Sequence, residues 1–177
     1  MLALAVTLAA LGLTACDPTG DVRFLDTPIA THRVDGVGWA VSLTPSRIYL
    51  GGTFTTVRNQ SGQSQGAYAN LAAFDRTTGA VIPGFRADTN GIVRTVAVGG
   101  DTLYLGGDFS RIGPATGGAI PVDTSAALPN TNFPKVVGIV RATVPDGSGG
   151  WYVGGAFSSI GGVPRANLAQ VMSNGTV

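Results

Sequence analysis

Short apolar runs separated by turn residues fill the chain from residue 36 onward. Residues 37–43, 92–98 and 136–144 are apolar runs, and a turn and a second apolar run follow each of them. Runs of this length between Gly, Pro, Asp and Ser clusters predict strands joined as β-hairpins. The pattern therefore predicts an all-β fold for residues 36–177.

The second run of each hairpin carries one repeated motif. It reads IYLGGTFTTV at 48–57, LYLGGDFSRI at 103–112 and WYVGGAFSSI at 151–160. The first glycines of the three copies, Gly51, Gly106 and Gly154, lie 55 and then 48 residues apart, a spacing typical of repeated supersecondary units. A further apolar run follows at 69–75 and at 166–172. We expect four-stranded units, with repeats near 36–90, 91–135 and 136–177.

A pair of glycines and a phenylalanine recur at fixed places in the motif, and we interpret them as packing residues. The glycines permit a close backbone approach or a β-bulge, and the aromatic ring fills the space between neighbouring sheets. A ligand-binding role is the alternative, but a stacked core needs the same aromatic in every unit. The residues are Gly51, Gly52, Phe54, Gly106, Gly107, Phe109, Gly154, Gly155 and Phe157.

These features resemble the delta-60 repeat family, whose members are bacterial β-propeller repeats of secreted and cell-surface proteins. The resemblance rests on the three Tyr-x-Gly-Gly-x-Phe segments, the Asn-Leu-Ala runs at 70–72 and 167–169, and the turn from Asp75 to Gly79. It implies β-propeller blades of four strands and brings no catalytic residue. Because no Asn-Leu-Ala follows the second motif, we expect the second blade to be distorted.

The number of repeats predicts an incomplete propeller. A closed propeller has 4–8 blades, whereas about three repeats are recognisable here. Open sheet edges pair with other chains. The alternatives are self-association of several copies, a place in a longer propeller, and a truncated gene, of which we favour truncation.

An apolar run of small residues and leucines opens the chain and ends at its only cysteine. Residues 1–15 are fewer than the ~20 of a membrane-spanning helix and have the size of a signal-peptide core. Residues 13–16, Leu-Thr-Ala-Cys, resemble the bacterial lipobox, whose cysteine is acylated. We predict a lipoprotein signal peptide at 1–15 and a lipidated Cys16 with a tether at 16–35. A buried Cys16 in a first strand is the alternative, which Asp17 and Pro18 disfavour.

The composition of the chain indicates which classes of partner it can bind. The chain has 27 Gly and 10 Pro, and all ten acidic residues are Asp, a mixture that favours turns over helices. The net charge is +1, so no basic field is present to attract nucleic acid. Acyl chains on Cys16 would hold the protein to a membrane. We therefore predict a cell-envelope protein facing the periplasm or the cell exterior.

The sequence presents no recognisable catalytic or metal-binding constellation. His32 is the only histidine and Cys16 is assigned to the anchor, which leaves no catalytic triad or zinc site. The best calcium candidates are Asp101, Asp108, Asp123 and Asp146, but single Asp residues in such loops are usually turn formers. We predict no enzyme, no cofactor and no metal.

The leading functional hypothesis is a binding or interaction module for a glycan, a peptide or an envelope protein. The second hypothesis is a structural or assembly fragment of a larger propeller. The third is a propeller hydrolase or lyase, which would need carboxylates or histidines in an arrangement that the sequence does not show.

Overall fold

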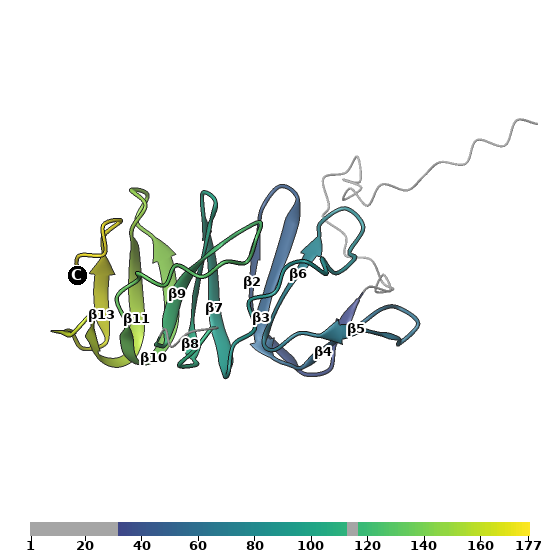
Figure 1. Cartoon of the computed structure of the whole chain (residues 1–177), viewed down its shortest axis with the longest axis horizontal. Coiled ribbons are helices and arrows are strands. Elements are labelled where there is room, and N and C mark those ends of the chain that lie inside the picture. Colours follow the sequence, from purple (N-terminus) through teal and green to yellow (C-terminus); the bar gives the residue numbers. More distant parts are fainter. Residues whose placement is uncertain (1–31, 113–116) are drawn as a thin grey trace, which may run out of the picture. The chain divides into compact units, whose positions relative to one another are not determined.

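The computed structural model describes residues 32–112 and 117–177, and these form thirteen strands in four antiparallel sheets (Figure 1). The predicted all-β fold is confirmed for this part of the chain. The strands form no closed propeller. The predicted signal peptide at 1–15, Cys16 and most of the tether at 16–35 lie outside the described residues.

Three of the sheets share one construction, and we call them blades 1, 2 and 3. In each, a first strand forms a hairpin with a second strand, and a third strand pairs on the other side of the second. Blade 1 contains β2 (Val37–Leu43), β3 (Arg47–Thr53) and β6 (Leu71–Asp75). Blade 2 contains β7 (Ile92–Gly99), β8 (Thr102–Asp108) and β9 (Ala119–Asp123). Blade 3 contains β10 (Val136–Pro145), β11 (Trp151–Ile160), β13 (Leu168–Val171) and the short β12 (Val163–Pro164).

The fourth sheet is small and packs on blade 1. It consists of β1 (Arg33–Val34), β4 (Thr56–Arg58) and β5 (Ser64–Ala67). Phe54, Val57 and Tyr68 are buried in one apolar cluster with Ala72 and Phe74 of blade 1.

The fourth strand predicted for each unit is reduced to single bridges. Phe74 pairs with Val81 beside blade 1, and Val122 pairs with Pro129 beside blade 2. Proline has no backbone N–H and cannot donate a hydrogen bond to a neighbouring strand. Pro129 in the second bridge, and Pro83 soon after the first, therefore limit these segments to one pair each.

Blade 2 is regular, so the expectation of a distorted second blade is wrong. Leu105 pairs with Ile120 in β9, as Leu50 pairs with Ala72 in β6. The residues of β9 that replace Asn-Leu-Ala are apolar and buried. A third strand needs apolar side chains in the right register, and the Asn-Leu-Ala sequence itself is dispensable.

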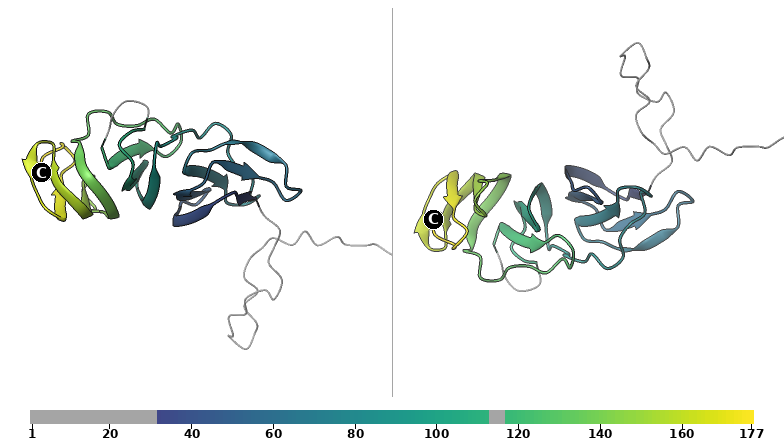
Figure 2. Two further views of the ribbon diagram at one scale, coloured as in Figure 1. Left: turned by 90° about the horizontal axis from the view of Figure 1, so that it is seen from below. Right: turned by 90° about the horizontal axis from the view of Figure 1, so that it is seen from above.

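Each blade packs against the next one in chain order, as both views in Figure 2 show. The first strand of one blade contacts two strands of the preceding blade, since β7 contacts β2 and β3, and β10 contacts β7 and β8. One apolar core lies between blades 1 and 2 and includes Tyr49, Val93 and Leu105. A second core lies between blades 2 and 3 and includes Tyr104 and Trp151.

Candidate functional site

A β-bulge recurs at the same place in the first strand of every blade. The register of each first hairpin shifts opposite the Gly-Gly pair, and the extra residue is Trp39 in β2, Arg94 in β7 and Arg141 in β10. A bulge redirects the side chain of its extra residue, and bulges are frequent next to functional sites. The repeat therefore presents an indole and two guanidinium groups at equivalent positions of neighbouring strands.

The second glycine of each pair makes this bulge possible. A Cβ atom on Gly52, Gly107 or Gly155 would collide with a backbone carbonyl of the first strand of the same blade. Only glycine allows the two strands to approach this closely. The predicted role of these glycines in close backbone approach thus corresponds to a contact within each blade.

The first glycine of each pair faces the next blade. A Cβ atom on Gly51 would lie 2.5 Å from Cγ1 of Val93 and 2.7 Å from Cγ2 of Val96, and one on Gly106 would collide with Val140. A Cβ atom on Gly154 would meet nothing closer than 3.9 Å. The first glycine therefore makes room for a neighbouring blade in blades 1 and 2.

The phenylalanines of the motif are buried in all three blades. Phe109 lies in the core between blades 1 and 2, and Phe157 lies in the core between blades 2 and 3. Phe54 lies in the cluster under the small fourth sheet. These rings contribute to packing and are not accessible to a ligand.

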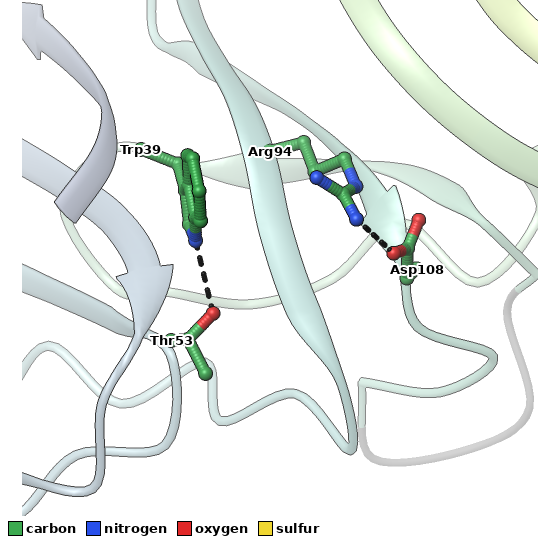
Figure 3. Close-up of polar contacts among 4 residues, drawn as sticks. All are labelled: Trp39, Thr53, Arg94 and Asp108. Atoms are coloured by element: carbon green, nitrogen blue, oxygen red, sulfur yellow. Dashed lines mark hydrogen bonds and ion pairs between the residues drawn. The ribbon is translucent and has the colours of Figure 1, made fainter. Parts of the chain in front are cut away.

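Hydrogen bonds hold two of the bulge side chains in place (Figure 3). The indole Nε1 of Trp39 donates to Oγ1 of Thr53 at 3.0 Å, and Nη2 of Arg94 donates to Oδ2 of Asp108 at 2.5 Å. Thr53 and Asp108 both follow the Gly-Gly pair directly. The guanidinium carbon of Arg94 lies 6.0 Å from the centroid of the Trp39 ring. We call Trp39, Thr53, Arg94 and Asp108 the Trp39 surface.

The Trp39 surface combines an exposed ring with a stable ion pair. Trp39 is 54% exposed. The hydrogen bond from Arg94 lowers the pKa of Asp108 against the opposing effect of burial, and the charges of Arg94 and Arg141 lower it further. The same hydrogen bond raises the pKa of Arg94. The pair therefore stays ionised at neutral pH.

Blade 3 lacks a polar partner for its bulge residue, Arg141. Ala156 stands where the other blades have Thr53 and Asp108, and it has no polar side-chain atom to bond Arg141. Arg141 therefore adds positive charge beside the neutralised Arg94–Asp108 pair. The site can offer a flat apolar ring, a cation and hydrogen-bonding groups to one ligand.

The four aspartates considered as calcium ligands make hydrogen bonds to other groups of the chain. Asp123 accepts backbone N–H groups of Ser125 and Ala126, and Asp146 accepts those of Ser148 and Gly150. Asp108 pairs with Arg94, and the backbone carbonyl of Asp101 accepts from Thr124. Within 32–112 and 117–177, no three His, Cys, Asp or Glu side chains are grouped to hold a metal ion.

A concave region lies between blades 2 and 3. This groove has a volume of about 330 Å³, and its lining includes Asn130, Asn132, Asn174 and the rings of Tyr104 and Trp151. Its polar rim could bind a small polar ligand, but it presents no exposed aromatic ring comparable with Trp39.

Two turn residues of the repeat were not identified from the sequence. The Asp35 carboxylate accepts the N–H groups of Thr55 and Thr56, and the Asn90 side-chain carbonyl accepts those of Ser110 and Arg111. Each of these residues is followed by a glycine and then by the first strand of a blade. The Asp-Gly and Asn-Gly pairs before the apolar runs could therefore have identified them from the sequence. The bulge residues had no such signal, because Trp and Arg share no chemical type.

The comparisons with known proteins match one part of the chain. A family model described as "Domain of unknown function (DUF5122) beta-propeller" matches residues 145–177. These residues contain β11, β12 and β13 of blade 3. Neither the curated proteins nor the solved structures gave a match. No helix in the described ranges has the length and apolar character to cross a bilayer. The match and the four small antiparallel sheets together support blades of the β-propeller type.

Proposed function

We propose that the protein is a non-catalytic binding module of the cell envelope, anchored through an acylated Cys16, and that it binds a glycan at the Trp39 surface. The observation that carries this proposal is the exposed indole of Trp39, which its hydrogen bond to Thr53 holds in a fixed orientation. A ring fixed before binding loses little conformational entropy when a ligand stacks on it. The resemblance of residues 13–16 to a lipobox supports the anchor.

A glycan matches the chemistry of this surface. A sugar ring has apolar C–H faces and a rim of hydroxyl groups. An indole face provides a partner for the C–H groups, while Arg94 and Arg141 supply donors and the exposed Thr53 hydroxyl supplies an acceptor for the hydroxyls. Aromatic rings with a few placed polar groups are typical of small-ligand sites.

The Trp39 surface favours binding over hydrolysis. Asp108 is the carboxylate of the site, and its ion pair with Arg94 keeps its pKa low. A general acid needs a pKa near the working pH. A protein ligand is the second candidate, because Trp and Arg also dominate the binding energy of protein interfaces.

The two tryptophans permit a direct binding experiment. Trp39 is exposed and Trp151 is buried, so acrylamide should quench mainly Trp39. The full chain, extracted from a bacterial membrane in mild detergent, is titrated with solubilised cell-wall glycans. We expect the ligand to protect the quenchable fluorescence. Trp39→Ala removes this signal, so calorimetry measures its affinity, which we expect to fall at least tenfold.

The matched control is Leu128→Ala, which removes an exposed apolar side chain that is not part of the Trp39 surface. It should bind glycan as the unaltered chain does. Equal loss in both variants, or unchanged affinity in Trp39→Ala, would contradict the proposed site. Capture of an envelope protein without glycan binding would favour the second candidate.

A further inference from the structure

Side chains at equivalent positions of the three blades are buried where a further blade follows and exposed in blade 3. The face that each blade turns toward the next blade is its forward face, and the opposite face is its rear face. On the forward face, Tyr49 is 0% and Tyr104 is 4% exposed, whereas Tyr152 is 45% exposed. Leu71 and Ala119 are buried, whereas Leu168 at the equivalent position is 68% exposed. The forward face of blade 3 is an interblade surface without its neighbour.

The rear face of blade 1 shows the complementary feature. Val96 and Thr143 are buried, whereas Val41 at the equivalent position is 60% exposed. Leu43 is also exposed, and Ile48 and Leu50 beside it are only partly buried. The β2 side of the rear face of blade 1, at Val41 and Leu43, is therefore the second uncovered interblade surface.

The small fourth sheet does not replace a neighbouring blade here. Phe109 and Ile112 lie in the core between blades 1 and 2. Phe54 and Val57 occupy the same motif positions in blade 1, where they pack with the fourth sheet. The fourth sheet and its cluster thus cover the phenylalanine turn and the β6 side of the rear face, where Ile48 and Leu50 pack against the buried Ala72 and Phe74. Val41 and Leu43 of β2 stay open.

The two uncovered faces have the same space and the same side chain that fit together between blades 1 and 2. The absent side chain of Gly51 leaves room for Val93 and Val96, and the space at Gly154 has no such occupant within 3.9 Å. In blade 1, Val41 stands at the position of Val96. A blade docked in the same way would place Val41 against Gly154.

The tyrosine of the motif also has a repeated polar partner in the next blade. The Tyr49 hydroxyl donates to the Thr124 carbonyl at 2.8 Å, and the Tyr104 hydroxyl donates to the Gly149 carbonyl at 3.3 Å. Both acceptors belong to hairpin turns of the following blade. The hairpin turns of blade 1, at residues 44–46 and 76–79, offer equivalent carbonyls to Tyr152.

We propose that the forward face of blade 3 docks onto the rear face of blade 1 of a second copy of this chain. The occupant is a second copy because the two faces continue the interface that already joins blades 1, 2 and 3. Such a head-to-tail contact joins two different patches and either closes a ring or extends a filament. The described blades of two copies number six, a count within the 4–8 of closed propellers, so a ring of two copies is the expected outcome.

Cysteine cross-linking in cells tests the contact and its polarity. The full chain is co-expressed as two tagged forms, one with Val41→Cys and one with Gly154→Cys. The Gly51–Val96 geometry places the new Cβ atoms near the ~3.8 Å separation of a disulfide. We expect a mixed disulfide between the two tagged forms after mild oxidation. Gly84→Cys replaces Gly154→Cys in the control, because Gly84 is open and distant from this face.

Native mass spectrometry of the detergent-extracted full chain gives the number of copies. We expect two copies, and Gly154→Arg should weaken the dimer at least tenfold, while Gly84→Arg should leave it unchanged. Absence of the mixed disulfide in folded variants, disulfides only between two Val41→Cys forms, or a dimer that resists Gly154→Arg would overturn the proposal. Circular dichroism establishes that each variant is folded.

Discussion

At the residue scale, the two glycines of each motif have separate roles. The second glycine lets two strands of one blade approach at the bulge, whereas the first leaves space for side chains of the next blade. The Gly-Gly sequence alone does not distinguish these roles, because both require the absence of a Cβ atom. The difference arises from the alternation of side chains across a strand.

Alanine substitutions separate the two roles. Gly51→Ala and Gly106→Ala should each lower the free energy of unfolding by about 1–3 kcal/mol, because the new methyl group overpacks the interblade core. Gly154→Ala should change it by less than about 1 kcal/mol, since its surroundings are open. Urea unfolding at low protein concentration measures the three values. Equal destabilisation at all three positions would contradict the assignment.

The turn at Asp35 predicts a dependence of stability on pH. Hydrogen bonds from the Thr55 hydroxyl and from the Thr55 and Thr56 N–H groups lower the pKa of Asp35 below its usual 3.8. The folded state therefore binds this proton less readily than the unfolded state, so the stabilisation is complete above about pH 5 and declines as pH falls below 4.

Asp35→Asn tests this dependence, because blade 2 already has an asparagine, Asn90, at the equivalent position. Asn90 makes the equivalent two backbone bonds in blade 2 without titrating in this range. We expect Asp35→Asn to leave the urea midpoint at pH 7 nearly unchanged and to reduce its fall between pH 5 and pH 2.5. Part of the fall should persist, because the pKa values of Asp75, Asp108, Asp123 and Asp146 are also lowered. An unaltered acid response would contradict the role of Asp35.

At the element scale, the sequence predicted the hairpins well. The apolar runs at 37–43, 92–98 and 136–144 correspond to β2, β7 and β10, and the motifs contain β11 and all but the first residue of β3 and of β8. Alternation of side chains and turn residues carries this information locally. A bulge at the Gly-Gly pair was anticipated, but its extra residues and the single-pair fourth strands were not, because they depend on which residue of another strand lies opposite.

Two valines of β10 test the predicted packing of one strand. Val140 is buried in the core between blades 2 and 3, and Val137 on the same strand is half exposed. Val140→Ala should lower the free energy of unfolding by about 1.5–3 kcal/mol, since a buried valine loses apolar contact. Val137→Ala should cost less than about 0.5 kcal/mol. Similar costs in urea unfolding would show that β10 does not join two blades.

At the scale of the whole molecule, the repeat explains both the fold and the surfaces that it leaves open. Each motif contributes a tyrosine to the forward face of its blade and a phenylalanine turn to the rear face. The forward face of one blade therefore packs against the rear face of the next. The Trp39 surface was not predicted, because it forms only where the bulges of two blades lie side by side. The all-β class required only the local pattern.

The predicted anchor belongs to the same scale because it places the molecule in the cell. Cys16→Ser should abolish labelling by a radioactive fatty acid and leave the unprocessed precursor, since the acylated thiol is lost. Gel analysis of labelled cells measures both results. Continued labelling of the Cys16→Ser chain would contradict the anchor.

The central claim is that the motif tyrosines are covered by the following blade, and chemical nitration of tyrosines tests it most directly. The Gly154→Arg chain is treated with tetranitromethane, and mass spectrometry of its peptides gives the rate at each tyrosine. We predict rapid nitration of Tyr152 and slow nitration of Tyr49 and Tyr104, because only Tyr152 has no blade over it. Nitration of Tyr49 or Tyr104 as fast as that of Tyr152 in the folded chain would contradict the stacking of the blades.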